Sequence, residues 1–212
     1  MTLIELERKG TSLVSDVLSN YKQKSIDHSV RSMSNLTDTF IPHVYVLKNF
    51  FNTRMLYLIN SFLEEKDLPW QDQPEYNKSG NIVGRQKLEW FPHPVFEEIS
   101  EILNLVTVQL NTVFKTDTMF KSVHIWKDSE GFEMDKHIDN PIIHYSLQLY
   151  LSKNVDKSIG TTFYYNNQEF KMPYEKNCGY LLDNLHPVVH SPSMILPSGV
   201  ERYSLYAIWT NN

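Results

Sequence analysis

The chain has 212 residues and a formal net charge of −5, and no dense Lys/Arg stripe offsets that charge, which argues against nucleic acid as a partner. One cysteine, Cys178, excludes an intrachain disulfide and a multi-cysteine zinc site. The acidic N-terminus does not resemble a signal peptide, and no segment approaches the roughly 20 apolar residues that span a bilayer. We therefore expect a soluble, cytoplasmic protein that does not associate with membranes.

The first half of the sequence predicts mainly helices. Residues 1–40 are polar, and Val14, Val17 and Leu18 form one face of a short helix, so we expect an N-terminal helical extension. The region 41–65 predicts a strand and then a helix capped by Asn52 or Thr53. A loop over 66–80 and a strand over 81–90 follow, and Pro94 begins a helix that continues to about residue 114.

After residue 120 the pattern changes to short, strand-like runs over 122–127, 142–151, 161–165, 179–183 and 202–209. Helices first and many short strands afterwards predict an α+β fold, an antiparallel barrel or sandwich buttressed by helices. We expect a single domain over 41–212, with its β core at about 120–210.

The triplet His137-Ile138-Asp139 is the first candidate site. In an extended segment residues i and i+2 point to the same side, so the imidazole and the carboxylate converge. With a second histidine they would form the two-His, one-carboxylate triad of non-haem Fe(II) oxygenases. The triplet alone is weak evidence, because a surface His beside a surface Asp is equally common.

The run from Ile142 to Leu151 alternates between apolar and polar residues. The polar face carries His144, Ser146, Gln148 and Tyr150. A barrel strand with its polar face toward a ligand cavity has this pattern, and so does an outer strand with that face in water.

The C-terminal block Arg202-Tyr203-Ser204 places Arg202, Ser204 and Tyr206 on one strand face. An Arg that points into an apolar barrel is costly unless it meets an anion, and a guanidinium matches a carboxylate. The alternative is an Arg at the start of an edge strand that reaches water. For Arg85 there are also two interpretations: it reaches the cavity mouth from its strand and binds an acidic substrate, or it is solvated, and we favour the solvated state.

Together these segments resemble the 2-oxoglutarate/Fe(II)-dependent dioxygenases, in particular their prolyl-hydroxylase-like branch. The similar segments are Gly131–Asp139 with its H-x-D, Gln148–Ser152, Gly160–Tyr164, Gly179–Pro192 and Gly199–Leu205 with its R-x-S. The resemblance covers about residues 120–210 and implies a double-stranded β-helix, a jelly-roll or cupin-like core.

The resemblance implies roles for the matching residues. His137, Asp139 and a distal histidine would bind Fe(II), and both His186 and His190 are available, with the spacing to Gly179 and Arg202 favouring His190. Arg202 and Ser204 would hold the far carboxylate of 2-oxoglutarate. The other predicted co-substrate contacts are Tyr150, Gln148 and Thr162. Trp126-Lys127-Asp128 departs from the family pattern, which leaves the contacts from that strand open.

The resemblance further implies hydroxylation of an amino-acid, peptide or protein side chain or another small molecule, with O2 consumed and succinate and CO2 released. Asp139 favours hydroxylation, because halogenating relatives lack this carboxylate. Two alternatives stay open: a non-catalytic cupin-like ligand-binding barrel, and a divalent-metal hydrolase or isomerase. The primary substrate and the oligomeric state are not predicted.

Overall fold

The computed structural model describes residues 16, 19–31, 33, 39–73, 84–152 and 156–211. Residues 19–31 are helical, and they are attached to the body of the protein by the ion pair Lys22–Glu101 and by the Ser29 hydroxyl, which donates to the Phe50 carbonyl at 3.0 Å. The helix face predicted at Val14, Val17 and Leu18 lies outside the described residues, and so do residues 74–80 of the loop predicted over 66–80.

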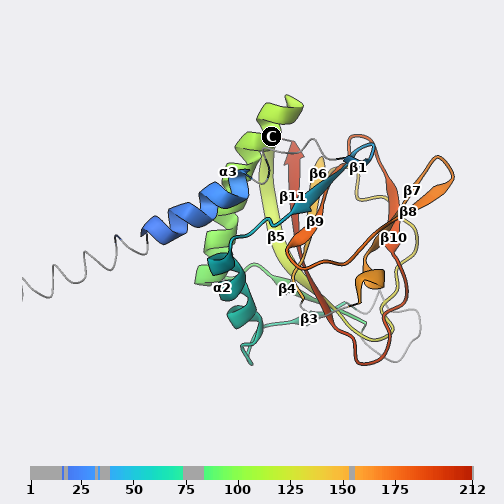
Figure 1. Cartoon of the computed structure of the whole chain (residues 1–212), viewed down its shortest axis with the longest axis horizontal. Helices are drawn as coiled ribbons and strands as arrows, with labels where there is room; N and C mark the ends of the chain where they lie inside the picture. Colours follow the sequence, from blue (N-terminus) through green and yellow to red (C-terminus); the bar gives the residue numbers. More distant parts are fainter. Residues whose placement is uncertain are drawn as a thin grey trace, which may run out of the picture.

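Two antiparallel sheets and two long helices form the body of the molecule (Figure 1). The helices are α2 (Thr53–Leu63) and α3 (Pro94–Phe114), and a short 3-10 turn, η2, covers Lys157–Ile159. The larger sheet has the order β1 (Thr39–Ile41), β2 (Val44–Lys48), β9 (Cys178–Asp183), β6 (Tyr145–Tyr150), β11 (Arg202–Asn211), β5 (Thr118–Asp128), β4 (Arg85–Glu89), β3 (Gln71–Asp72). The smaller sheet has the order β10 (Val189–Pro192), β7 (Thr161–Tyr165), β8 (Gln168–Met172).

The two helices begin where the sequence predicts. The Asn52 side chain accepts the Met55 N–H at 2.9 Å and caps α2. Pro94 occupies the first turn of α3, where its missing N–H costs nothing, and α3 ends at Lys115 in the left-handed conformation (φ 55°).

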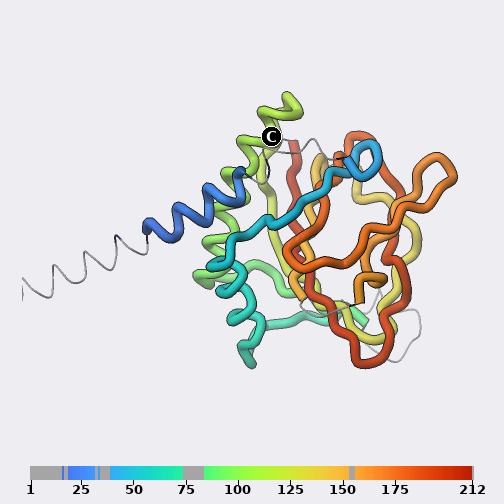
Figure 2. The backbone as a smooth tube through the Cα atoms, viewed as in Figure 1, coloured from blue at the N-terminus to red at the C-terminus, as the bar shows by residue number. Residues whose placement is uncertain are grey.

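The two faces of the larger sheet have different neighbours. One face packs against α2 and α3 through buried side chains that include Leu147, Leu149, Leu205, Ala207 and Trp209. The smaller sheet lies on the other side, so the chain forms layers in the order helices, larger sheet, smaller sheet (Figures 1 and 2). The predicted α+β class is confirmed as a mixed fold with a large antiparallel sheet.

Apolar and polar residues alternate along β6 and β11, and this alternation places the hydrophobic core on one face of the sheet and the cavity on the other. Leu147 and Leu149 face the helices, whereas Gln148 between them faces the smaller sheet. In β11, Leu205 is paired with Leu149, and Tyr206 with Gln148. Because paired residues share a face, the polar faces of both strands line the same space.

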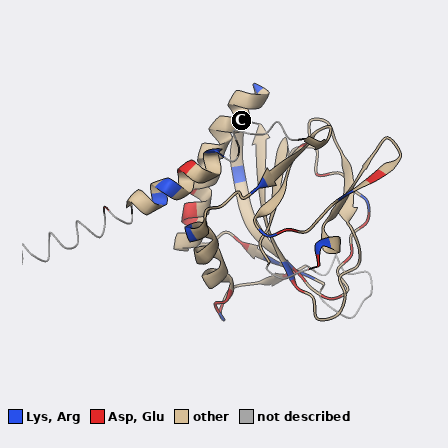
Figure 3. Cartoon of the chain, viewed as in Figure 1, with Lys and Arg blue, Asp and Glu red and all other residues tan. Residues whose placement is uncertain are grey.

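Charges are mixed over the described part of the chain, where Lys and Arg alternate with Asp and Glu rather than covering one face in this view (Figure 3). Among the described helices, none combines the length and apolar character that crossing a membrane requires.

His124 on β5 is buried without a hydrogen-bond partner for its Nε2 among the described residues. Burial, and after it the charges of Lys87 and Arg85, lower the pKa of His124 from 6.5 to about 3. The unfolded chain therefore binds a proton at this residue over a pH range where the folded chain does not. The contribution of neutral His124 to the free energy of unfolding is therefore complete above the pKa of the unfolded chain, and it is lost as the pH falls toward the pKa of the folded chain.

We therefore expect His124→Leu to reduce the acid sensitivity of folding. Between pH 7 and pH 5 the wild-type protein should lose about 2 kcal/mol more unfolding free energy than the variant, since a pKa unit corresponds to about 1.4 kcal/mol. Urea unfolding at the two pH values measures the difference, and groups common to both proteins cancel. Equal losses in the two proteins would contradict this interpretation of His124.

Candidate active site

The structure brings His137, Asp139 and His190 together. His137 and His190 form an isolated antiparallel bridge, in which the His137 N–H donates to the His190 carbonyl at 3.0 Å and the reverse bond is 2.8 Å long. Their ring centroids are 4.4 Å apart, and His190 Nε2 lies 3.7 Å from Asp139 Oδ1. One donor atom from each residue lies within 4.8 Å of the others. His190 is therefore the histidine that meets the H-x-D triplet, and His186 lies in a different cluster.

Backbone carbonyls orient both imidazoles. Nδ1 of His137 is 2.9 Å from the Asp135 carbonyl, and Nδ1 of His190 is 3.0 Å from the Val188 carbonyl. A carbonyl only accepts, so each Nδ1 carries a proton, and in the neutral imidazole Nε2 then presents its lone pair. Burial lowers the pKa of His190. The negative charge of Asp139 raises this pKa and the neighbouring His137 lowers it, but both effects are smaller than that of burial. The neutral, ligand form of His190 is thus favoured.

Three polar side chains hold the Asp139 carboxylate by its Oδ2 atom. Ser146 donates at 2.5 Å, the Tyr206 hydroxyl at 3.1 Å and the Asn184 amide at 3.3 Å. Burial, followed by the charge of Asp139, raises the pKa of Tyr206 well above its usual value, so the phenol remains a donor. With Oδ2 fixed in this way, Oδ1 is oriented toward His190.

We expect Tyr206→Phe to weaken metal binding by about 10- to 100-fold, as is usual when a partner of a metal-binding carboxylate is removed. The ring stays in place, so the change removes the hydroxyl, with its hydrogen bond to Asp139 and its contact with Ser146. Competition with a fluorescent chelator measures the affinity for Ni²⁺. Tyr164→Phe, which removes a phenol that contacts Ser191 but not Asp139, is the matched control. Equal affinities for the two variants would show that Tyr206 does not support the carboxylate.

The donor set fits a divalent transition-metal ion. Two imidazoles and one carboxylate each bring a donor atom within 4.8 Å of the others, and this is the ligand set that binds non-haem Fe(II) with its remaining positions open. In the neutral form of each imidazole the Nδ1 contact leaves Nε2 as the ligand atom.

The triad lines a cavity of about 520 Å³, a volume typical of small-molecule sites. Its wall also contains Trp126, Gln148, Thr161, Tyr180, Arg85 and Arg202. Both arginines are almost inaccessible to solvent, with exposures of 5% for Arg85 and 2% for Arg202. The interpretation of Arg85 as a solvated residue was wrong, because β4 pairs with β5 and directs this side chain inward.

Asp128 holds the two arginines, and sequence reasoning did not find this contact. Asp128 on β5 is paired with Arg202 on the neighbouring strand β11 and with Arg85 on the other neighbour, β4. The three residues therefore lie side by side across the sheet. Asp128 accepts from Arg85 Nε at 2.5 Å and from Arg202 Nε at 2.9 Å. Burial alone would raise the pKa of Asp128, but the charges and hydrogen bonds of both arginines outweigh it and lower the pKa.

Arg202 keeps one nitrogen for a ligand. Its Nε donates to Asp128, and its Nη1 donates to the carbonyls of Ile159 at 2.5 Å and Gly160 at 3.3 Å. Nη2 has no hydrogen-bond partner among the described residues. The sequence predicts two parallel hydrogen bonds from the guanidinium to a carboxylate. Because Nε and Nη1 already donate to the protein, only the two N–H groups of Nη2 are left for a ligand.

Of the other residues predicted to contact 2-oxoglutarate, some line the cavity and some do not. Gln148 lines the cavity, accepts from the Tyr180 hydroxyl at 2.6 Å and donates to Ser204 at 3.3 Å. Ser204 and Tyr150 are fully buried and do not line it, and the Tyr150 hydroxyl is 2.8 Å from the Thr161 hydroxyl.

Thr162 is also not part of the cavity wall. Its hydroxyl donates to Ser193 at 2.9 Å, whereas its neighbour Thr161 lines the cavity. Successive residues of a strand point to opposite sides, so the prediction is displaced by one residue.

No protein-family model and no curated protein matches the sequence. Solved structures do match. A prolyl-4-hydroxylase from Pseudomonas putida is 16% identical with a TM-score of 0.65, and the match covers 87% of this chain and 99% of that one. A Trichoplax adhaerens prolyl hydroxylase, solved with a hypoxia-inducible-factor peptide, is 12% identical with a TM-score of 0.59 and covers 92% of each chain.

A third match is HygX from Streptomyces hygroscopicus, solved with nickel, 2-oxoglutarate and hygromycin B. It is 11% identical with a TM-score of 0.61, and the match covers 80% of this chain and 83% of that one. At such identities the likeness establishes the fold rather than the reaction. The resemblance seen in the sequence is thus confirmed by the structure: this chain has the fold of the prolyl-hydroxylase-like 2-oxoglutarate/Fe(II) oxygenases.

Proposed function

We propose that the chain is an Fe(II)- and 2-oxoglutarate-dependent dioxygenase that hydroxylates an amino-acid, peptide or protein side chain. One observation carries the proposal: His137, Asp139 and His190 share a single cavity with the buried guanidinium of Arg202. A metal centre alone fits many reactions, whereas a metal centre facing a buried cation fits a ligand that both chelates the metal and ends in a carboxylate.

The fold supports the same proposal. The two antiparallel sheets enclose a cavity, as in a double-stranded β-helix, and the triad lies where β10 faces the segment before β6. We propose that residues 41–212 form this oxygenase domain and that residues 1–40 extend it.

The residues divide the work as follows. Two neutral imidazoles and Asp139 Oδ1 would hold Fe(II), and Ser146, Asn184 and Tyr206 would keep the carboxylate in place. Arg202 Nη2 would bind the far carboxylate of 2-oxoglutarate. When bound, the iron would supply the oxidative decarboxylation of 2-oxoglutarate to succinate and CO2 and the oxidation of the substrate by O2.

The substrate class is inferred from the neighbours. The Trichoplax adhaerens enzyme was solved with a peptide, which supports a peptide or protein substrate. HygX was solved with hygromycin B, so the same fold also accommodates a small molecule.

Uncoupled turnover tests the proposal. The protein with Fe(II), ascorbate, O2 and 2-oxoglutarate should form succinate, and His137→Ala should lower the rate at least 100-fold. His28→Gln, which alters a histidine outside the cavity, is the matched control and should retain the wild-type rate. Peptide pools are then screened by mass spectrometry for the gain of one oxygen atom.

Succinate formation that survives in His137→Ala would contradict the proposal. So would the absence of succinate from a wild-type protein that binds Fe(II) and 2-oxoglutarate, and that result would favour the non-catalytic binder. Hydrolysis or isomerisation of a substrate without 2-oxoglutarate would favour the divalent-metal hydrolase or isomerase.

A further inference from the structure

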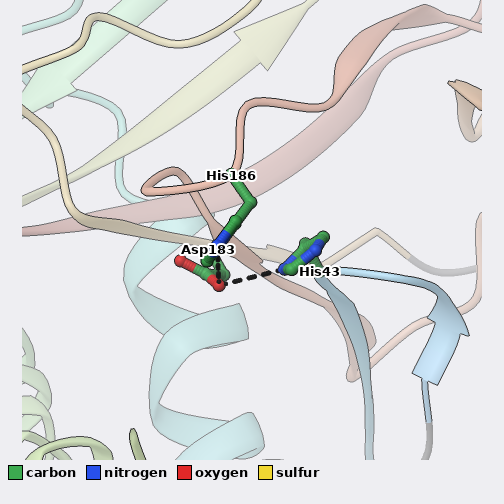
Figure 4. Close-up of side chains that lie close together, drawn as sticks. All are labelled: His43, Asp183 and His186. Atoms are coloured by element: carbon green, nitrogen blue, oxygen red, sulfur yellow. Dashed lines mark hydrogen bonds and ion pairs between the residues drawn. The ribbon is translucent and has the colours of Figure 1, made fainter.

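A second His-Asp-His cluster lies outside the cavity (Figure 4). His43 is in the turn between β1 and β2, Asp183 is the last residue of β9, and His186 follows in the next turn. His43 Nδ1 is 3.1 Å and His186 Nδ1 is 2.9 Å from the same oxygen, Asp183 Oδ2. The two imidazole rings stack at 4.1 Å with an angle of 17° between their planes.

These distances match those between ligands of one metal ion. Two atoms that are each about 2.1 Å from an ion lie roughly 3.0 Å apart at a right angle and roughly 3.4 Å apart at a tetrahedral angle. The two Nδ1–Oδ2 distances, 3.1 Å and 2.9 Å, match the spacing expected at a right angle, and all three donor atoms lie within 4.8 Å of one another. The donor atoms are thus close enough to share one ion, but the lone pair of an imidazole nitrogen lies in the plane of its ring, so one of the two stacked rings has to turn to present its nitrogen. The exposed side chain of His186 has room to do so.

The cluster is open to solvent on its imidazole side. The side chain of Asp183 is 9% exposed, whereas those of His43 and His186 are 34% and 61% exposed. An ion can thus reach the two nitrogens while the carboxylate stays fixed. Without an ion, each imidazole donates its Nδ1–H to Asp183; an ion would replace both protons and shift them to the Nε2 atoms, which need no protein partner.

The backbone holds the three residues in place. His43 has a φ of 68°, a left-handed conformation that costs a residue with a Cβ roughly 1 kcal/mol. The Asp183 N–H donates to the His43 carbonyl at 3.0 Å, and the His186 N–H donates to the Asp183 carbonyl at 3.1 Å. The Leu185 N–H donates to Asp183 Oδ1 at 3.2 Å, which leaves Oδ2 to the histidines.

We propose that His43, Asp183 and His186 form a second site for a divalent transition-metal ion of the Zn²⁺ class. Two imidazoles and one carboxylate are borderline ligands, which bind Zn²⁺ and Ni²⁺ in preference to Mg²⁺ or Ca²⁺. The site is separate from the triad, but Asn184, which follows Asp183, donates to Asp139. A bound ion would tie the β1–β2 turn to the turn that carries this amide.

Equilibrium dialysis against Zn²⁺, with metal counted by mass spectrometry, tests the proposal. The variant His137→Ala/Asp139→Ala removes the triad, so Zn²⁺ bound to it reports on the second site. We expect about one ion per chain in this variant and at least a ten-fold loss of affinity when His43→Asn or His186→Gln is added. Asn tolerates a positive φ and residue 186 is exposed, so neither change should disturb folding.

His28→Gln in the same background is the matched control and should keep the ion. As a measurement that needs no further substitution, the imidazole ¹⁵N resonances of His43 and His186 should shift on addition of Zn²⁺ while that of His28 stays unchanged. The proposal is overturned if the triad variant binds no Zn²⁺, or if it binds Zn²⁺ without shifts at His43 and His186. Neither result depends on the proposed oxygenase activity.

Discussion

Asp128→Ala is expected to lower the free energy of unfolding by about 3–5 kcal/mol, the usual cost of leaving a buried ion pair with one partner removed. Asp128 is fully buried and is bonded to both Arg85 and Arg202, so its loss leaves two guanidinium groups without their carboxylate. Asp128→Asn should lose less, because the amide oxygen still accepts one bond. Urea denaturation measures both values.

Asp72→Ala is the control for Asp128. Asp72 is exposed and is bonded to Gln86 at the end of the larger sheet, so its replacement should change the stability by no more than about 0.5 kcal/mol. If Asp128→Ala also lost less than about 1 kcal/mol, the three buried charges would not form the coupled group described above.

Arg202→Met is expected to raise the KM for 2-oxoglutarate by about 10- to 150-fold, because a hydrogen bond to a charged group contributes about 1.5–3 kcal/mol. The kcat at saturation should fall much less, since in the proposed complex Arg202 binds the end of 2-oxoglutarate that is remote from the metal. Steady-state succinate formation at varied 2-oxoglutarate separates the two constants.

Lys171→Met removes an exposed cation from β8 and should leave the KM unchanged. Arg202→Lys keeps the positive charge but gives up the guanidinium contacts with the Ile159 and Gly160 carbonyls, so an intermediate KM is expected. An unchanged KM in Arg202→Met would mean that the co-substrate carboxylate binds elsewhere.

The sequence predicted the parts of the site that depend on local pattern. The alternation over 142–151 separated the residues that pack on the helices from Gln148, which faces the cavity, and the H-x-D spacing brought His137 and Asp139 to one side. Such patterns survive folding because strand periodicity is a property of the backbone.

The contacts that the sequence did not predict join residues far apart in the chain. Asp128 is 43 residues from Arg85 and 74 from Arg202, and which strands become neighbours is decided by packing rather than by local preference. The partners of Asp139 come from three separate segments, and His43 meets Asp183 across 140 residues. The position of Thr162 outside the cavity wall has another origin, since a shift of one residue in a strand reverses its face.

Calorimetric titration of the protein with 2-oxoglutarate, with and without Ni²⁺ as a redox-inert substitute for Fe(II), tests the central claim most directly. If the triad and Arg202 bind one ligand between them, the metal-loaded protein binds 2-oxoglutarate at least 100-fold more tightly than the metal-free protein, and His137→Ala removes that difference. Equal binding with and without metal, or no binding to the metal-loaded protein, would contradict the account.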